Sequence, residues 1–352
     1  MKALIAAGGT AGHVVPALAV ADALRADGDE VVFAGGERAE AELVPKAGYE
    51  LRRLDVQGIS RSNPVKAARA VLKAGGAFVT ARGMLRAERP DVVMGGGGYV
   101  AGPVGAAAVL GRVPLVLTEA DSHLGLTNRA LARFARRVCL AFPIDGLSGG
   151  RYLVTGRPVP PPVTDRAGAR ERFGLAEDDT CVLVFGGSLG ARSISEAAIE
   201  AFAGASFHVL HACGERDYPS LRDRVPAGGR YDLRPYITPF GDALAACDLC
   251  VARAGGSIFE IASHGRPALL VPYPHAAADH QSANAEWMRR AGAAVVVGDA
   301  QLTAERLARE VGELLGDPGR LRAMGRASAG LARPDAARAI ASELVAAAAP
   351  GR

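Results

Sequence analysis

Two glycine-rich turns, half a chain apart, are the parts of this sequence best suited to chemistry. They read Gly-Gly-Thr-Ala-Gly-His at residues 8–13 and Gly-Gly-Ser-Leu-Gly-Ala at residues 186–191, and each follows a short apolar run. Glycine lets the backbone turn tightly and presents bare N–H groups at a helix N-terminus, where they hold an anion. Neither turn has the spacing of a dinucleotide site or the Gly-Lys-Ser/Thr ending of a P-loop, so a dehydrogenase or an NTPase gains little support.

Three further segments supply groups that could contact a ligand. Four glycines at residues 95–98 precede Tyr99 and follow an apolar run, which places them at the carboxyl end of a sheet, where open α/β sheets bind ligands. The Arg-Ala-Gly-Gly-Ser segment at residues 253–257 opens a helix that carries Glu260 in its first turn, a position that either binding or the helix dipole explains. Residues 272–284 gather His, Asp, Gln, Ser and Asn side chains, which suit sugar hydroxyls.

The elements that position these segments alternate steadily between strand and helix. The expected strands lie at residues 4–7, 30–33, 91–94, 114–118, 182–185, 207–211, 249–252, 268–271 and 293–297. The prolines of residues 156–162 forbid both helix and central strand and mark a linker. We therefore predict an α/β protein with two Rossmann-like, doubly wound parallel-sheet domains that face one cleft. They span residues 1–157 and 158–334, and a helix at residues 335–352 packs back on the first domain.

Length and composition agree with this outline. The 352 residues exceed what one core usually fills. No long uncharged apolar run is present and the chain opens on a strand, so we expect neither a membrane span nor a signal peptide. The five cysteines are an odd number and suggest reduced, buried thiols, and Cys247-x-x-Cys250 lacks the second pair that a zinc site needs.

The formal net charge is +4, and the basic excess lies in the first half of the chain. It is densest between Arg61 and Arg89, where basic and apolar residues alternate and Glu88 is the single acid. Such a stretch suits an anionic membrane surface, and equally the solvated face of an ordinary helix. It has no tyrosine or tryptophan for base stacking, which argues against nucleic acid as a partner.

Taken together, these motifs resemble the peptidoglycan N-acetylglucosaminyltransferases of glycosyltransferase family 28. The matching segments, in order and spacing, are residues 8–19, 95–103, 125–129, 186–191 and 279–284, so the resemblance covers nearly the whole chain. It implies an inverting GT-B enzyme that moves GlcNAc from UDP-GlcNAc to the muramyl C4 hydroxyl of lipid I, the undecaprenyl-diphosphate-linked muramyl pentapeptide. The product is lipid II, made by a peripheral protein at the cytoplasmic face of the bacterial cell membrane without an essential metal or other cofactor.

The resemblance also implies roles for individual residues. His13 is the candidate catalytic base, with substrate binding as the open alternative. An inverting transfer also needs positive potential near the leaving diphosphate, which the second glycine turn supplies through its helix dipole and backbone N–H groups. The residues implied on the acceptor side are Thr10, Ala11, Gly12, His13 and Tyr99. Those implied on the donor side are Gly187, Ser188 and Gly190 for the diphosphate, Ile237 for the uracil, Glu260 for the ribose, and His280, Gln281 and Asn284 for the GlcNAc hydroxyls. The remaining expected binding residues are Gly98, Asp121, Arg157, Gly256 and Ser257.

Two departures from the family pattern leave alternatives open. Residues 119–121 read Glu-Ala-Asp where the family has Glu-Gln-Asn, so Asp121 places a carboxylate where an amide is expected. Residues 156–160 read Gly-Arg-Pro-Val-Pro where the family has Gly-Asn-Pro-Val-Arg, and Arg157 is the candidate to replace the arginine lost at Pro160. The alternatives are a family 28 paralogue with another UDP-sugar or lipid acceptor, a UDP-GlcNAc 2-epimerase, and a non-catalytic nucleotide-sugar-binding protein.

Overall fold

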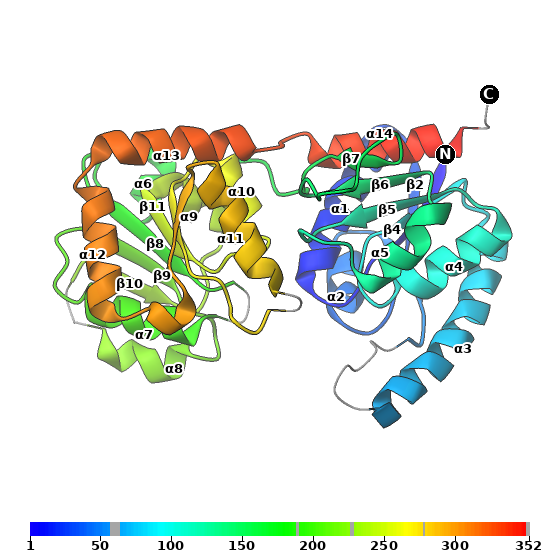
Figure 1. Ribbon diagram of the computed structural model, residues 1–352, viewed down its shortest axis with the longest axis horizontal. Helices are drawn as coiled ribbons and strands as arrows, with labels where there is room; N and C mark the ends of the chain where they lie inside the picture. The colour runs from blue at the N-terminus through cyan, green and yellow to red at the C-terminus, as the bar shows by residue number, and fades with distance from the viewer. Residues whose placement is uncertain (57–63, 188–189, 226–228, 277–278, 350–352) are drawn as a thin grey trace. The chain divides into compact units, whose positions relative to one another are not determined.

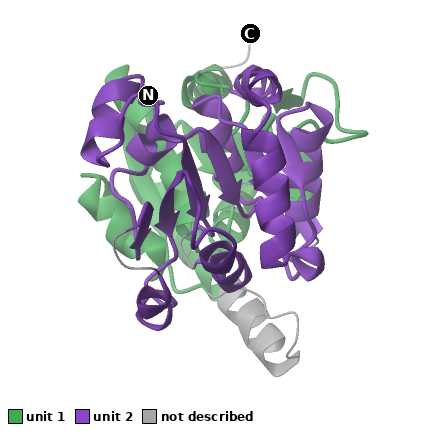
Figure 2. Cartoon of the chain, turned by 90° about the vertical axis from the view of Figure 1, so that its left-hand side faces the viewer, with its two compact units in different colours: residues 1–159, 333–352 green, residues 160–332 purple. Residues whose placement is uncertain are grey.

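The computed structural model describes residues 1–56, 64–187, 190–225, 229–276 and 279–349 (Figure 1). The chain divides into two compact units, one of residues 1–159 with 333–352 and one of residues 160–332 (Figure 2). The boundary therefore falls two residues after Arg157, within the proline-rich linker. Ser188 of the second glycine turn and Arg61 of the basic stretch lie outside the described residues.

The first unit is built on a parallel sheet, to which its described residues contribute seven strands in the order β3-β2-β1-β4-β5-β6-β7. The strands are β1 (Lys2–Ala6), β2 (Glu30–Gly35), β3 (Glu50–Arg53), β4 (Val92–Gly95), β5 (Leu115–Glu119), β6 (Arg137–Leu140) and β7 (Tyr152–Val154). The central strands are apolar on both faces because helices cover both sides of the sheet. The strand order reverses between β1 and β4, so the glycine segments that follow these two strands meet at a switch point, where such sheets bind ligands.

Two helical layers complete the first unit. Its helices are α1 (Ala11–Ala26), α2 (Ala39–Lys46), α3 (Pro64–Glu88), α4 (Ala101–Gly111), α5 (Leu126–Leu131), η1 (Ala132–Phe134) and α14 (Ala336–Ala348). The C-terminal helix α14 packs against α1 and β4 and buries Ile340 and Leu344 in the core of this unit. An ion pair of 2.7 Å between Arg137 Nε and Glu343 Oε2 ties α14 to β6.

The second unit repeats the design with a parallel sheet whose described strands number six, in the order β10-β9-β8-β11-β12-β13. The strands are β8 (Cys181–Phe185), β9 (His208–Ala212), β10 (Tyr231–Arg234), β11 (Leu249–Ala252), β12 (Ala268–Leu270) and β13 (Ala294–Val296). The helices are α6 (Arg166–Arg172), α7 (Arg192–Ala201), α8 (Tyr218–Leu221), η2 (Arg222–Arg224), α9 (Phe240–Ala246), α10 (Ile258–Ser263), α11 (His280–Arg290), η4 (Asp299–Gln301), α12 (Ala304–Leu315) and α13 (Pro318–Leu331). The switch point lies between β8 and β11, where residues 186–191 and 253–257 follow the two strands.

The cysteines and the apolar and basic stretches of the chain have the following places in the structure. All five cysteines are buried and free, and the Sγ atoms of Cys247 and Cys250 lie 3.7 Å apart, as expected for reduced thiols. In the described part of the chain, no helix is both long enough and apolar enough to cross a membrane. The basic stretch falls largely on α3, where Arg82 and Arg86 are exposed, while the side chains of residues 64–74 are not described.

Candidate active site

The first glycine turn connects β1 to α1 and packs closely against its surroundings. Gly9 has a φ of +111°, which favours glycine. A Cβ at Gly8 would lie 2.7 Å from Val100 Cγ2, and a Cβ at Gly98 would overlap the carbonyl oxygen of Gly8. Glycine is therefore needed at residue 8, where side chains of Val100 and Glu40 pack closely, and at residue 98, where the backbone of Gly8 approaches.

A buried carboxylate that the sequence did not single out holds this turn in place. Glu40, on α2, is fully buried and accepts hydrogen bonds from Gly9 N at 2.8 Å, Gly36 N at 2.9 Å and the Tyr99 hydroxyl at 2.6 Å. Burial alone would raise the pKa of Glu40, but these hydrogen bonds outweigh it and lower that pKa. The hydroxyl of Tyr99, which we expected to line the acceptor side, is therefore committed to Glu40.

Glu40→Gln is expected to destabilise the protein by about 1–3 kcal/mol at pH 7, because an amide brings its own N–H donors to a site that offers only donors. Since the folded pKa of Glu40 is lowered, its stabilisation is complete above the ordinary value of 4.5 and is lost as the pH falls through the folded value. Urea unfolding at several pH values should therefore show the difference from wild type shrinking below pH 4.5. Glu42→Gln, on the exposed side of α2, is the control and should change stability by less than about 0.5 kcal/mol at pH 7.

His13 lies in the first turn of α1, half-buried, with its Nδ1 3.3 Å from Thr10 Oγ1. Its ring packs against the glycines of residues 95–98, since a Cβ at Gly97 would lie 2.7 Å from His13 Cδ2. Burial lowers the pKa of His13 and the charge of Arg157 lowers it further, while Asp121 and Glu40 act in the opposite direction. The lowered pKa favours the neutral imidazole, which is the form able to accept a proton.

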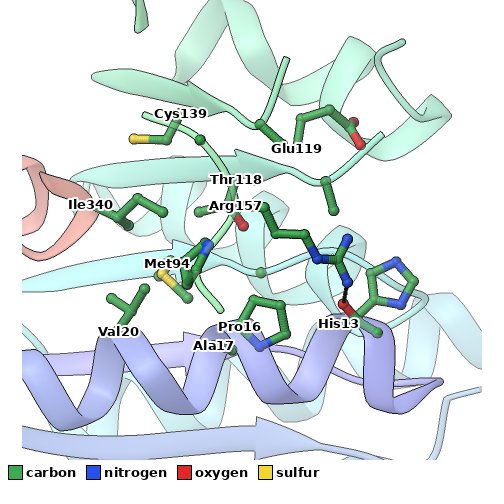
Figure 3. Close-up of a pocket in the computed structure, with 16 residues that line it drawn as sticks. His13, Pro16, Ala17, Val20, Met94, Thr118, Glu119, Cys139, Arg157 and Ile340 are labelled. Atoms are coloured by element: carbon green, nitrogen blue, oxygen red, sulfur yellow. Dashed lines mark hydrogen bonds between the residues drawn. The ribbon is translucent and has the colours of Figure 1, made fainter. Parts of the chain in front are cut away.

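His13 lines two hollows of the first unit. The larger has a volume of about 540 Å³, and its polar side is formed by Asp121 and Asn128 while Phe78 and Leu126 are among its apolar walls. The smaller is narrow, with a volume of about 20 Å³, and is drawn in Figure 3. Its lining residues include Gly12, His13, Pro16, Val20, Met94, Glu119, Cys139, Arg157 and Ile340.

The loop after β5, which carries Asp121, is folded around a second buried carboxylate. Glu119 accepts hydrogen bonds from Asp121 N at 3.2 Å, Gly125 N at 2.8 Å and Asn128 Nδ2 at 2.9 Å. Burial raises the pKa of Glu119. Glu119 and Asn128 therefore hold the loop in the shape that places Asp121 in the wall of the larger hollow.

The predicted acceptor-side residues all lie in the first unit, as do Gly98, Asp121 and Arg157, which were predicted to bind substrate without assignment to donor or acceptor. Gly98, Tyr99 and Asp121 line the larger hollow with His13, and Gly12 and Arg157 line the smaller one with it. The other two predicted residues of this turn, Thr10 and Ala11, lie at the N-cap and the first position of α1.

The second glycine turn, between β8 and α7, also contains glycines with positive φ values and close backbone packing. Gly187 and Gly190 have φ values of +88° and +73°, and Gly190 N donates to Gly187 O at 3.0 Å. A Cβ at Gly190 would overlap the carbonyl oxygen of Cys213, so only glycine fits there. The turn leads into the N-terminus of α7, where backbone N–H groups and the helix dipole favour an anion.

Arg253, at the end of β11, ties the surroundings of this turn together. It is 8% exposed, and its Nη1 lies 2.6 Å from Asp299 Oδ1 while its Nη2 donates to Ser193 Oγ at 2.8 Å. It also donates to the carbonyl oxygen of Val271 at 3.1 Å. The guanidinium thereby joins the first turn of α7, the end of β12 and η4. The segment that Arg253 begins was expected to contact a ligand, but no site role was predicted for Arg253 itself.

Arg253→Met is expected to destabilise the protein by about 2–3 kcal/mol, because the carboxylate of Asp299 and the carbonyl oxygen of Val271 lose a buried donor. Binding of UDP, the donor nucleotide implied by the family resemblance, should weaken as well, because among the described contacts α7 and η4 would then be joined only by the hydrogen bond from Ser193 Oγ to Asp299 Oδ1 at 2.7 Å. Thermal unfolding and calorimetric titration with UDP measure the two effects. Arg289→Met, which removes an exposed partner of Glu286 on α11, is the control and should alter stability by less than about 1 kcal/mol. Equal effects of the two variants would contradict the role given to Arg253.

The other predicted donor-side residues, together with Gly256 and Ser257, which were predicted to bind substrate without assignment to donor or acceptor, lie around the end of β11, with the exception of Ile237. Gly256 and Ser257 precede α10, whose first turn carries the half-buried Glu260. His280, Gln281 and Asn284 lie on the first turns of α11. Ile237 is buried in the loop after β10, an edge strand that lies three positions from β11 in the sheet.

Two of the predicted sugar-binding side chains hold backbone in place. Gln281 Oε1 accepts from Tyr273 N at 2.9 Å. Asn284, only 2% exposed, donates through Nδ2 to the carbonyl oxygen of Ala254 at 3.0 Å, which fixes α11 against the segment that follows β11. Its Oδ1 has no hydrogen-bond partner among the described residues.

Comparison with protein families covers both units. The model of the glycosyltransferase family 28 N-terminal domain matches residues 3–140, and that of the glycosyltransferase family 28 C-terminal domain matches residues 181–340. A relative from Moorella thermoacetica is 42% identical over 97% of this chain and 97% of its own. It is named UDP-N-acetylglucosamine--N-acetylmuramyl-(pentapeptide) pyrophosphoryl-undecaprenol N-acetylglucosamine transferase.

Solved structures with the same fold include glycosyltransferases and epimerases. The crystal structure of Acinetobacter baumannii MurG matches with a TM-score of 0.81 and 29% identity, over 98% of this chain and 99% of that one. A UDP-GlcNAc 2-epimerase from Neisseria meningitidis, bound to UDP-GlcNAc, matches with a TM-score of 0.69 over 98% of this chain and 100% of its own. Its 14% identity shows a shared fold alone.

Proposed function

The chain belongs to glycosyltransferase family 28, and from this premise we propose that it transfers GlcNAc from UDP-GlcNAc to the muramyl C4 hydroxyl of lipid I, forming lipid II. The observation that carries the proposal is the 42% identity, along nearly the full length of both chains, with a relative named for this transfer. The site supports it, because a histidine whose pKa is lowered borders a hollow large enough for a sugar and each unit carries a glycine turn at its switch point.

The proposed reaction is a direct displacement with inversion. His13 takes the proton from the C4 hydroxyl of the acceptor as that oxygen forms a bond to the anomeric carbon of GlcNAc. The bond between the anomeric carbon and the diphosphate oxygen breaks on the opposite side, and UDP leaves with the electron pair. The N-terminus of α7 stabilises the charge that develops on the diphosphate.

The donor is proposed to occupy the second unit. The N–H group of Gly187, with Ser188, binds the diphosphate, whereas the Gly190 N–H already donates to the carbonyl oxygen of Gly187 at 3.0 Å and shapes the turn. Glu260 binds the ribose hydroxyls and Ile237 contacts the uracil. His280 and Gln281 bind the GlcNAc hydroxyls, and Asn284 supports them by holding the carbonyl oxygen of Ala254. Helix dipole and backbone N–H groups take the place of a metal in this scheme, so no metal or other cofactor is proposed.

The lipid acceptor places the reaction at a membrane surface. We propose that the first unit associates peripherally with the cytoplasmic face of the cell membrane, which carries anionic lipid. The described end of α3 supports this, because Arg82 and Arg86 are exposed and Val79, in the preceding turn, is 68% exposed. The substrates are then UDP-GlcNAc and lipid I, and nucleic acid is not a partner.

Product analysis tests the proposed reaction. With UDP-GlcNAc and a lipid I analogue, the expected product carries one added HexNAc with an inverted, β-configured bond at the muramyl C4 oxygen, as mass spectrometry and NMR would show. With UDP-GlcNAc alone, no UDP-ManNAc should form. Appearance of UDP-ManNAc would identify a 2-epimerase, and transfer from a different UDP-sugar only would identify a paralogue with a changed donor.

A further inference from the structure

The arginine that replaces the asparagine of the family pattern lies beside the proposed catalytic histidine. We propose that Arg157 acts on His13 and not on the UDP-sugar: its guanidinium fixes the carbonyl of Gly12 and places a permanent positive charge next to the His13 ring. This inference rests on the proposed role of His13, but its central test does not require catalysis.

The contact with Gly12 meets a need created by the sequence of α1. In an α-helix the carbonyl of Gly12 would accept from the N–H of residue 16, but residue 16 is a proline and has no N–H. Arg157 Nη2 donates to this carbonyl oxygen at 2.6 Å. The side chain thereby supplies the donor that Pro16 removes, one residue before His13.

The backbone immediately before Arg157 adopts a conformation that requires glycine. Gly156 has a φ of +82°, and a Cβ there would overlap the side chain of Arg333 at the start of the C-terminal segment. The guanidinium then reaches the narrow cavity that it shares with His13, and Figure 3 shows the two side chains next to each other. We infer that Arg157 is a positioning residue.

Charges of both signs act on the His13 ring. Arg157 lowers the pKa of the imidazole, whereas Asp121 after β5 and Glu40 on α2 raise it. Glu119 also lines both hollows, and Thr10 offers an uncharged hydroxyl. Without Arg157, burial alone would oppose the two carboxylates, so the pKa of His13 would rise and a larger share of His13 would be protonated and unable to accept the acceptor's proton.

NMR titration of the His13 ring nitrogens in the substrate-free protein tests the inference, with His13→Gln to assign the signal. Arg157→Gln and Arg157→Met are expected to raise the midpoint by about 0.5–1 pH unit, because the positive charge is lost. Arg157→Lys should stay near wild type, and Asp121→Asn should shift the midpoint down. Arg151→Gln removes an equal charge from an exposed loop of the same unit and is the matched control.

A midpoint in Arg157→Gln and Arg157→Met equal to that of Arg151→Gln would overturn the inference. Kinetics give a second readout: the acid limb of kcat/KM should move up with the titration, while the KM for UDP-GlcNAc stays within about twofold of wild type. A rise in that KM of about tenfold or more without a shifted titration would assign Arg157 to donor binding instead. If the wild type transfers no GlcNAc, the proposed function fails, and the titration still decides the role of Arg157.

Discussion

Replacing His13 with alanine is expected to lower the kcat for GlcNAc transfer by about 10²–10⁴-fold, the usual contribution of a positioned general base. The effect should appear in kcat because the proton moves only as the acceptor oxygen attacks. The KM for UDP-GlcNAc should change little, since the donor is proposed to bind residues of the other unit. Steady-state kinetics with a lipid I analogue, at saturating donor, measure both constants.

The control for this variant is a second histidine outside the site. His208 lies in β9 of the second unit and pairs with Asp179 at 3.3 Å, so His208→Ala should keep kcat within about twofold of wild type. If His13→Ala retains more than about a tenth of the wild-type kcat and raises the KM for the acceptor, His13 binds the acceptor and is not its base.

Gly98→Ala is expected to destabilise the protein by about 3–5 kcal/mol, from a left-handed backbone and a collision that nothing flexible can relieve. Gly98 has a φ of +73°, and an added Cβ would overlap the carbonyl oxygen of Gly8. Because the neighbouring Gly97 packs against the ring of His13, transfer activity should fall with stability. Urea unfolding followed by circular dichroism gives the loss.

Gly146→Ala separates the backbone effect from the collision. Gly146 lies in the same unit with a φ of +76°, but no atom lies within 4 Å of its added Cβ. Its alanine variant should lose only about 1–2 kcal/mol and keep full activity. Similar losses in the two variants would show that the glycine segment after β4 does not depend on contact with the first turn.

The central strands could be predicted from the sequence, and several outer ones could not. β1, β4, β8 and β11 are short apolar runs because helices cover both faces of a parallel sheet. The edge strands β3 and β10 read Glu-Leu-Arg-Arg and Tyr-Asp-Leu-Arg, with neither an apolar run nor a clean alternation. Pairing with a neighbouring strand makes them extended, and that neighbour is found only in three dimensions.

In the candidate site too, features set by local sequence could be predicted, and features that depend on distant neighbours could not. Glycine spacing and a histidine after the first turn indicated an anion-binding turn and a base, because these properties are local. Glu40 and Arg253 gave no such signal, since their partners are backbone N–H groups, carbonyl oxygens and side chains brought together from several loops. For the same reason the sequence could not show that Tyr99 and Asn284 direct their polar atoms into the protein framework.

The central claim is that this chain joins GlcNAc to lipid I, and the rate of UDP release from UDP-GlcNAc tests it most directly. The rate should rise strongly when a lipid I analogue is added, and the analogue should gain one HexNAc by mass. UDP-GlcNAc binding without any acceptor-dependent release would contradict the claim and identify a protein with a different acceptor.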